Sequence, residues 1–378
     1  MNKGEKIKLI DIRKKLHKNP ELSGKEKNTS EYIIEILKKL SPDEIITEIG
    51  GFGTAAIFDS GQHGATIMFR AELDALPIIE SNNFSYKSGN TGISHKCGHD
   101  GHMTILIGLA ERIKRENFKG KIILLFQPAE ETAKGAKRIV EDTKFKFLKP
   151  DYIFALHNLP GFTKGTIILR KGIFTSTSIG MIIKLKGETS HAGHPENGNN
   201  PALAMTKIIN ELDNLSKNIQ DSAMITIIYA KLGEIAFGTS AGKAVIMATF
   251  RSNTKNTLKI MQNKAISLVK EKAEKQNLDY EIEWVEYFPE IVNDDECVDI
   301  VKKSAKNIRN KIKFIEQPFT WTEDFSYFTQ KIKGAFFGLG SGKNHPQLHN
   351  SDYDFPDEII SDGINIFVEI IKEICRRK

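Results

Sequence analysis

The spacing of apolar residues along the first 160 positions predicts alternating helices and strands. Three segments carry apolar residues at helical spacing, with proline after the first two: 7–16, 31–40 and 104–113. Four apolar runs are predicted as strands: 55–58, 66–69, 122–126 and 152–156. The runs 66–69 and 122–126 are almost continuously apolar, which is typical of strands covered on both faces. The pattern therefore predicts an α/β domain whose mostly parallel sheet is covered by helices.

A different pattern begins near residue 177. It predicts, in order, a strand, a helix, two strands, a helix and a strand, at 179–185, 201–215, 223–232, 244–251, 257–276 and 280–285. This β-α-β-β-α-β order is that of a ferredoxin-like domain. The α/β character then returns with a helix, a strand and a helix, at 295–310, 335–339 and 357–377. We therefore expect a discontinuous first domain, residues 1–176 and 288–378, interrupted by an inserted α+β domain, residues 177–287.

Composition limits the location and partners of the chain. Hydrophobic residues make up 40% of its 378 residues and charged residues 27%, and no run of about 18 apolar residues is present, so no membrane association is expected. The three cysteines are too few for a disulfide scaffold, and the first 16 residues lack the apolar core of a signal peptide, which predicts a reducing, cytoplasmic location. The 54 basic and 48 acidic residues are interleaved, which favours a small anionic substrate over nucleic acid.

The densest chemical signal is the segment His95–His102, which holds three histidines, a cysteine and an aspartate before a predicted helix. Cys97 and His99, two positions apart in a loop, can point the same way, and a thiolate with an imidazole suits zinc or a similar transition metal. Asp100 has the wrong spacing for a further ligand and is a candidate to orient an imidazole. The alternative interpretation is a helix-capping loop with a chance cysteine.

Two adjacent carboxylates, Glu130 and Glu131, follow the predicted strand 122–126 after Pro128. Strand ends are where α/β sheets build their sites. Neighbouring carboxylates can divide the work of hydrolysis, one binding a metal and the other taking a proton from metal-bound water. An acidic pair near a helix start is also common simply because it complements the helix dipole.

Histidines follow two other predicted strands. His157 ends the strand 152–156, where a lone histidine is often only a core residue, and His345 and His349 lie in the loop after the strand 335–339. With His349 included, the candidate ligands number five, enough for two metals that share a water: Cys97, His99, Glu131, His157 and His349.

The inserted domain has polar candidates of its own. His191 follows the first strand of that domain, and an imidazole donor there can stabilise the oxyanion of a tetrahedral intermediate if the domain closes over the metals. A solvated loop histidine is the equally weighted alternative. Arg251 ends another strand and can hold a substrate carboxylate in a bidentate manner, although a structural role fits a lone arginine as well.

Taken together, these segments resemble the metal-dependent aminoacylase and carboxypeptidase family, in the branch of hippurate hydrolases, plant auxin-conjugate hydrolases and N-acetyldiaminopimelate deacetylases. The resemblance spans almost the whole chain. It rests on the following segments: 17–22, 69–77, 95–102, 127–131, His157, 187–195, 322–328 and 348–350.

The resemblance implies an amidohydrolase that cleaves N-acyl amino acids with a water activated by two divalent ions, with supply deciding among Zn, Mn, Co and Ni. It implies that Glu130 is the general base and that His191 reaches the oxyanion in a neighbouring subunit's site. It also implies that the inserted domain is a dimerisation or lid domain and that the chain is a homodimer. Arg251 and Asn200 are the expected substrate-binding residues.

Three positions depart from the family pattern: Glu72 replaces an aspartate, Gln347 replaces a proline and Asn200 replaces an aspartate. None is a proposed ligand, so the departures bear on the substrate rather than on the reaction. A dipeptidase or aminopeptidase of the same family is an alternative, which needs an acidic group to hold a free substrate amine. A metal-binding dimer without catalysis is a third interpretation, and the presence of Glu130 beside Glu131 argues against it.

Overall fold

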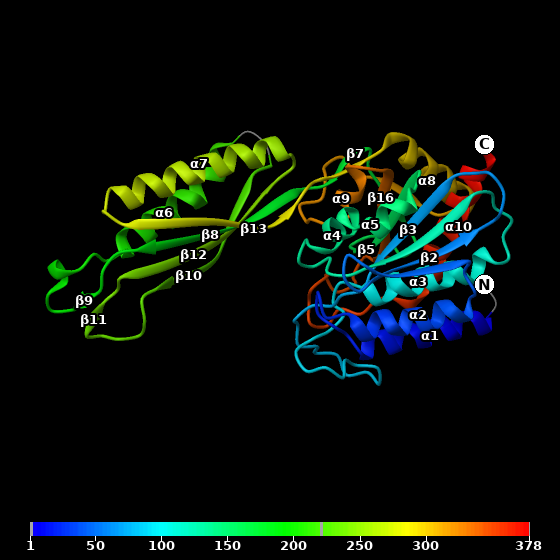
Figure 1. Cartoon of the computed structure of the whole chain (residues 1–378), viewed down its shortest axis with the longest axis horizontal. Coiled ribbons are helices and arrows are strands. Elements are labelled where there is room, and N and C mark those ends of the chain that lie inside the picture. Colours follow the sequence, from blue (N-terminus) through cyan, green and yellow to red (C-terminus); the bar gives the residue numbers. More distant parts are fainter. Residues whose placement is uncertain (1–2, 220–221, 378) are drawn as a thin grey trace. The chain divides into compact units, whose positions relative to one another are not determined.

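The protein divides into two compact units in its computed structural model, which describes residues 3–219 and 222–377 (Figure 1). Unit 1 consists of the chain up to Phe174 with Ile291–Gln317 and the segment from Glu323 onward, and unit 2 consists of Thr175–Glu290 with Pro318–Thr322. The unit boundaries near 175 and 290 lie close to the expected domain boundaries. The segment 318–322 differs, because the sequence pattern assigned it to the first domain and it packs within unit 2.

A mixed sheet forms the centre of unit 1. Within the described residues its strands run in the order β1 (Glu44–Ile49), β2 (Gly53–Asp59), β4 (Lys121–Gln127), β3 (Thr66–Glu72), β5 (Tyr152–Pro160), β16 (Lys333–Gly342), β6 (Ile167–Leu169) and β15 (Ile312–Phe314). The central neighbours β4, β3, β5 and β16 are parallel, whereas β1–β2, β2–β4 and β16–β6 are antiparallel. The mostly parallel centre confirms the predicted class, and it aligns the carboxyl ends of its strands at one edge.

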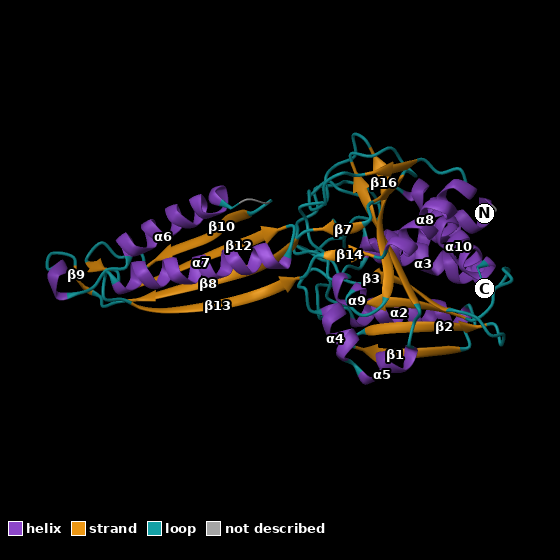
Figure 2. Cartoon of the chain, turned by 90° about the horizontal axis from the view of Figure 1, so that it is seen from above, coloured by secondary structure: helices purple, strands orange, loops and turns teal. Residues whose placement is uncertain are grey.

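Helices cover both faces of this sheet. Ile67 and Phe69 point into the core that includes α3 (His99–Ile113) and α10 (Ile360–Arg376), and Met68 between them is buried on the opposite face. Figure 2 shows α3, α8 and α10 on one side of the strands and α4 and α9 on the other. The bounds of the remaining helices of unit 1 are α1 (Lys3–Lys18), α2 (Lys27–Lys39), α4 (Gly135–Glu141), α5 (Thr143–Leu148), α8 (Asp295–Asn307) and α9 (Ser326–Thr329).

Unit 2 has the predicted ferredoxin-like order. Its elements are β8 (Thr177–Lys186), α6 (Ala202–Leu215), β10 (Met224–Leu232), β12 (Lys243–Ser252), α7 (Lys255–Glu274) and β13 (Asp279–Phe288). The strands form an antiparallel sheet in the order β10-β12-β8-β13, and α6 and α7 lie together on one of its faces (Figure 2). Apolar residues alternate along β12, so that Ile246, Ala248 and Phe250 face the helices and form the core.

The structure also contains elements that the apolar pattern did not predict. These are β1, β6, α4, α5, α9 and β15, together with β7 (Gly172–Thr175), β9 (Ser190–His191), β11 (Thr239–Ser240) and β14 (Ile291–Asn293). In addition, α3 begins at His99 rather than at residue 104. Its first turn carries buried polar side chains, which interrupt the apolar periodicity on which the prediction depended.

No helix within the described part of the chain is both long and apolar enough to cross a bilayer.

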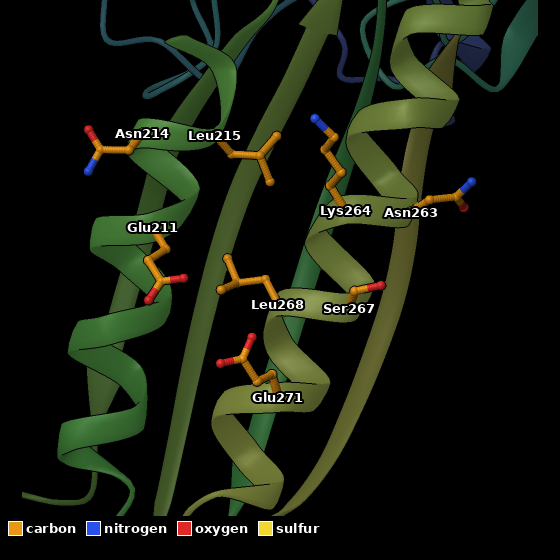
Figure 3. Close-up of a pocket in the computed structure, with 8 residues that line it drawn as sticks. All are labelled: Glu211, Asn214, Leu215, Asn263, Lys264, Ser267, Leu268 and Glu271. Atoms are coloured by element: carbon orange, nitrogen blue, oxygen red, sulfur yellow. The ribbon is translucent and has the colours of Figure 1, made fainter. Parts of the chain in front are cut away.

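A depression of about 600 Å³ lies between α6 and α7 in unit 2, and its lining includes no histidine, cysteine or aspartate (Figure 3). Glu211 and Glu271 reach it from the two helices, with Leu215 and Leu268 between them. This lining does not match the metal chemistry indicated by the sequence.

Candidate metal centre

The candidate ligands come from the carboxyl-end edge of the sheet in unit 1. β3 and β4 are in register from Thr66 opposite Lys121 to Glu72 opposite Gln127, and His157 of β5 lies opposite Gly338 of β16. The turn after β4 carries the two glutamates, α3 begins after β3 and its loop, and the loop after β16 carries the final histidine. Parallel strands thus bring segments far apart in sequence to one place.

The structure brings the predicted ligands together in unit 1. The Sγ atom of Cys97 lies 3.3 Å from Nε2 of His157, and Oε1 of Glu131 lies 3.9 Å from Nε2 of His99 and 3.8 Å from Nε2 of His349. Four of the groups whose donor atoms lie within 4.8 Å of one another share members in this cluster: Cys97, His99 and His157; Cys97, Glu131 and His349; His99, Glu130 and Glu131; Glu72, His99 and His102.

Two donor atoms in this cluster are buried without a hydrogen bond among the described residues. They are Nε2 of His99 and Oε1 of Glu131. Buried polar atoms without partners are costly, and native proteins rarely retain them without a bound ion or water. Thiolate, imidazole and carboxylate donors also match the coordination preferences of zinc and neighbouring divalent metals. The residues therefore fit a metal centre.

Backbone partners fix which nitrogen of each imidazole faces the cluster. Nδ1 of His99 donates to the backbone oxygen of Asp74 at 2.8 Å, and Nδ1 of His157 donates to the backbone oxygen of Asn158 at 2.9 Å. Each Nε2 therefore carries a lone pair toward the other donors, which is the tautomer a metal requires.

Cys97 and His99 are separated by a glycine whose backbone conformation other residues avoid. Gly98 has a φ of 94°, and a Cβ at this position would lie 2.4 Å from the side-chain oxygen of Asn158. A larger residue would be strained and would also collide with β5. Gly98 therefore allows the chain to turn from Cys97 into the first turn of α3 with both donors facing one point.

Burial makes the acidic groups of the cluster hard to ionise in the absence of cations. The pKa of Glu130 is raised well above its usual value by burial and then by the nearby Glu323, and that of Glu131 is raised by burial and then by Asp74. Burial also raises the pKa of the Cys97 thiol, with Glu131 adding to the effect. A divalent cation among these groups would reverse the balance by favouring their charged forms.

Asp100 contacts an imidazole, although that imidazole is not a candidate ligand. Its Oδ2 accepts from Nδ1 of His17 at 2.8 Å and lies 3.3 Å from Arg13, which also pairs with Asp354 at 2.6 Å. The group His17, Asp100 and Asp354 has metal-like spacing, but the Arg13 guanidinium already neutralises it. His345 is likewise engaged, because its Nε2 donates to the backbone oxygen of Asp354 at 2.6 Å.

A buried network next to the cluster was not singled out from the sequence. The fully buried guanidinium of Arg70 pairs with Glu72, with Glu323 at 2.8 Å and with Asp324 at 2.9 Å. Glu72 in turn accepts from Nδ1 of His102 at 2.7 Å. The sequence did contain a signal for this network. Arg70 and Glu72 are charged residues two positions apart in an apolar strand, a spacing that places both side chains on one face.

The candidates of the inserted domain lie in unit 2. His191 is exposed in β9, and its Nδ1 accepts the N–H of Gly193 at 3.0 Å. Asn200 bonds within unit 2, to the Ser240 hydroxyl at 3.0 Å and to the N–H of Ala202 at 2.9 Å.

Arg251 has no carboxylate at ion-pairing distance within the described residues. Its Nη1 donates to the Thr320 oxygen at 3.2 Å and to the Thr322 hydroxyl at 3.4 Å, and burial lowers its pKa. His191, Asn200 and Arg251 all belong to the segment 175–290 of unit 2. Their roles toward a substrate stay predictions.

Comparison with known proteins agrees with this chemistry. The chain is 32% identical to a hippurate hydrolase of Campylobacter jejuni over 95% of its length and 94% of that protein. It is 30% identical to an N-acetyldiaminopimelate deacetylase of Halalkalibacterium halodurans, with 97% and 99% of the two chains covered.

Solved structures agree as well. A dinuclear metal-binding peptidase of the M20 family from Bacillus subtilis superposes with a TM-score of 0.84 at 26% identity, with 100% of both chains covered. A putative aminohydrolase from methicillin-resistant Staphylococcus aureus superposes with a TM-score of 0.86 at 27% identity, with 98% and 97% covered. The sequence profile of peptidase family M20/M25/M40 matches residues 68–373, and the chain belongs to this family.

Proposed function

We propose that this protein is an amidohydrolase that cleaves N-acyl amino acids with a water activated by two divalent ions. The observation that carries the proposal is the placement of Glu130, a buried carboxylate that belongs to one of the donor groups, with His99 and Glu131, and is not one of the five expected ligands. A metal store needs ligands alone, whereas hydrolysis also needs a base within reach of the water. The two similar relatives with named substrates, hippurate and N-acetyldiaminopimelate, act on N-acylated amino acids.

Five residues would hold the ions: Cys97, His99, Glu131, His157 and His349. Cys97 belongs to two of the donor groups, so its thiolate would be a ligand in either of them. When bound, divalent ions lower the pKa of water and polarise a carbonyl oxygen. Zn, Mn, Co and Ni all accept this mixture of sulfur, nitrogen and oxygen donors, and supply decides among them.

Glu130 performs the proton transfers. It takes a proton from the attacking water and later donates that proton to the leaving amine, so that a carboxylic acid and a free amino acid are released. Its neighbour Glu131 shares the same turn and cannot take this role while it binds metal. Cys97 is not a nucleophile in this scheme, because a ligated sulfur has its lone pair engaged.

Unit 2 supplies the groups that complete the reaction. Because Nδ1 of His191 accepts a hydrogen bond, the neutral ring carries its proton on Nε2, which is then free to donate to the oxyanion. Arg251, a guanidinium without a carboxylate partner in the described chain, holds the substrate carboxylate. Asn200 is a second proposed substrate-binding residue. These roles require unit 2 to act as a lid, in its own chain or in a partner.

We further propose that the protein is a homodimer in the cytoplasm. β10 is an edge strand, and Ile228 and Tyr229 on it are 61% and 45% exposed, while Ile235 and Phe237 in the following loop are fully exposed. Edge strands with exposed apolar residues pair readily with a second copy. The cysteines recorded within the described residues are all free, as expected in a reducing compartment.

Release assays with N-acetyl amino acids and with free dipeptides separate this proposal from the peptidase alternative. A dipeptidase needs a carboxylate that holds the free substrate amine, and a Zn- or Mn-loaded protein with that function would prefer the dipeptides. A metal-binding dimer without catalysis would release product from neither class.

Replacing the base should separate metal binding from chemistry. Glu130→Gln is expected to keep its metal content and to lose about a hundred- to ten-thousand-fold in kcat, because general acid–base catalysis contributes about that much. The matched control is Glu141→Gln, an exposed glutamate at the end of α4, which should leave kcat unchanged. Near-normal turnover by Glu130→Gln would remove Glu130 from the role of base.

Replacing the thiol should lower metal occupancy itself. Cys97→Ala removes a donor common to two groups, so elemental analysis after dialysis should find fewer ions per chain. Cys297→Ala is the matched control, because Cys297 is also a buried thiol, in α8, and belongs to none of the donor groups described above. Equal occupancy in the two variants would give Cys97 a structural role only.

Mixing two inactive variants tests whether His191 acts across a dimer. His191→Ala and Glu130→Gln proteins, combined under conditions of subunit exchange, should regain part of the activity, since a mixed dimer contains one site with both residues intact. Mass spectrometry verifies the exchange. If exchange occurs and activity does not return, His191 acts within its own chain or has no role in the reaction.

A further inference from the structure

The turn that carries Glu130 and Glu131 holds a strained backbone conformation. Ala129, directly before the two glutamates, has a φ of 53°, which lies in the left-handed region that residues with a Cβ rarely adopt. Its carbonyl oxygen accepts the N–H groups of Gly135 at 3.0 Å and Lys134 at 3.3 Å. Such a conformation persists only where surrounding contacts determine it.

The N–H of Ala129 is held by a distant residue, Glu26. The Oε1 atom of Glu26 accepts the N–H groups of Ala129 and Gly24, each at 2.8 Å, and the Glu26 residue is fully buried. Both backbone polar groups of Ala129 are therefore held. Glu26 accepts the Ala129 N–H, and the N–H groups of the downstream turn donate to the Ala129 carbonyl oxygen.

A second buried carboxylate holds the other side of the turn. Oδ2 of Asp74 accepts the N–H of Glu131 at 3.0 Å and the Ser23 hydroxyl at 2.7 Å. The backbone oxygen of Asp74 also accepts from Nδ1 of His99. Glu130 consequently sits between two amides, each fixed by a carboxylate from outside the turn, and Asp74 ties the turn to a candidate metal ligand.

The side chain of Glu26 does not stabilise its own helix. Glu26 immediately precedes α2, yet it forms no side-chain cap bond there. Glu21 stabilises the start of α2 instead, because its Oε2 accepts the N–H of Thr29 at 2.7 Å and the Thr29 hydroxyl at 2.8 Å. Burial and the nearby Asp74 raise the pKa of Glu26 to about 7, so its placement opposes ionisation. Apart from the N–H of Gly24, the described partner of the Glu26 carboxylate lies in the distant turn, and a buried acid with a raised pKa is typical of functional sites.

We propose that Glu26 is a positioning residue for the hydrolytic reaction: it fixes the amide of Ala129 and thereby sets the location of the Glu130 carboxylate. This inference rests on the function proposed above, in which Glu130 is the base. It assigns Glu26 no contact with substrate or metal. The consequence is that loss of Glu26 should affect the chemical step more than substrate binding.

Three substitutions at Glu26 and one control test the proposal. Glu26→Ala removes the acceptor, and Glu26→Asp retains a carboxylate that is one methylene shorter and serves as a second variant with less loss of volume. Glu26→Gln keeps an oxygen that can accept from both amides. The matched control is Glu21→Ala, which removes the contacts at the start of α2 without touching the turn.

The readouts are kcat and KM of the Zn- or Mn-loaded enzyme, metal content, and hydrogen–deuterium exchange of the segment 127–134. Glu26→Ala and Glu26→Asp should lower kcat at least tenfold with KM changed less than threefold, keep their metals, and speed exchange in the segment. Glu26→Gln should restore most of kcat and slow exchange. Glu21→Ala should leave kcat and the exchange of this segment as in the wild type.

The positioning role would be overturned if Glu26→Ala or Glu26→Asp exchanged the segment 127–134 at the wild-type rate. It would also be overturned if Glu26→Ala and Glu21→Ala changed kcat and exchange equally. The exchange experiment does not depend on turnover. If the wild-type enzyme hydrolyses no N-acyl amino acid, the proposed function fails, while slow exchange in wild type and fast exchange in Glu26→Ala still establish that Glu26 holds the turn.

Discussion

The structure of unit 1 depends on the burial of like charges at one edge of its sheet. Glu130, Asp74, Glu26 and Glu323 are each no more than 5% exposed, and Glu131 shares their site. Ionised carboxylates placed together out of water repel one another and lose hydration, which costs several kcal/mol for each unpaired ion. The fold has to offset this cost with cations, with hydrogen bonds, or by keeping some groups neutral.

Positively charged side chains offset the buried carboxylates on two sides of the cluster. Arg70 supplies a fixed positive charge to Glu72, Glu323 and Asp324, while Arg13 and His17 do the same for Asp100. Between these networks lie the donors of the candidate metal centre, where Nε2 of His99 and Oε1 of Glu131 have no hydrogen bond in the described chain. Two divalent ions there would supply the missing positive charge and the hydrolytic chemistry at once.

The sequence predicted the features that depend on a periodic pattern of apolar residues. Apolar runs located β3, β4 and β5, and because parallel strands end at one edge, polar residues just after them were expected to meet. The interrupted pattern likewise predicted the ferredoxin-like order of unit 2. In both cases the pattern lies within short stretches of neighbouring residues, so it could be recognised in a single sequence.

The remaining contacts could not be predicted because they join residues with no periodic relation. Arg70 meets Glu323 across 253 positions, and Glu26 meets Ala129 across 103. The spacing of Asp100 suggested that it orients an imidazole, but only the packing of α1 against α3 shows that the imidazole is His17. Short elements such as β6 and β15 have too few residues to show a period.

The central claim is that this cluster holds two divalent ions, and native mass spectrometry of the chain reconstituted with zinc or manganese tests it most directly. The account predicts two ions per chain, and loss of hydrolysis when a chelator removes them. A folded chain that binds one ion or none, or that hydrolyses N-acyl amino acids equally well without metal, would contradict it.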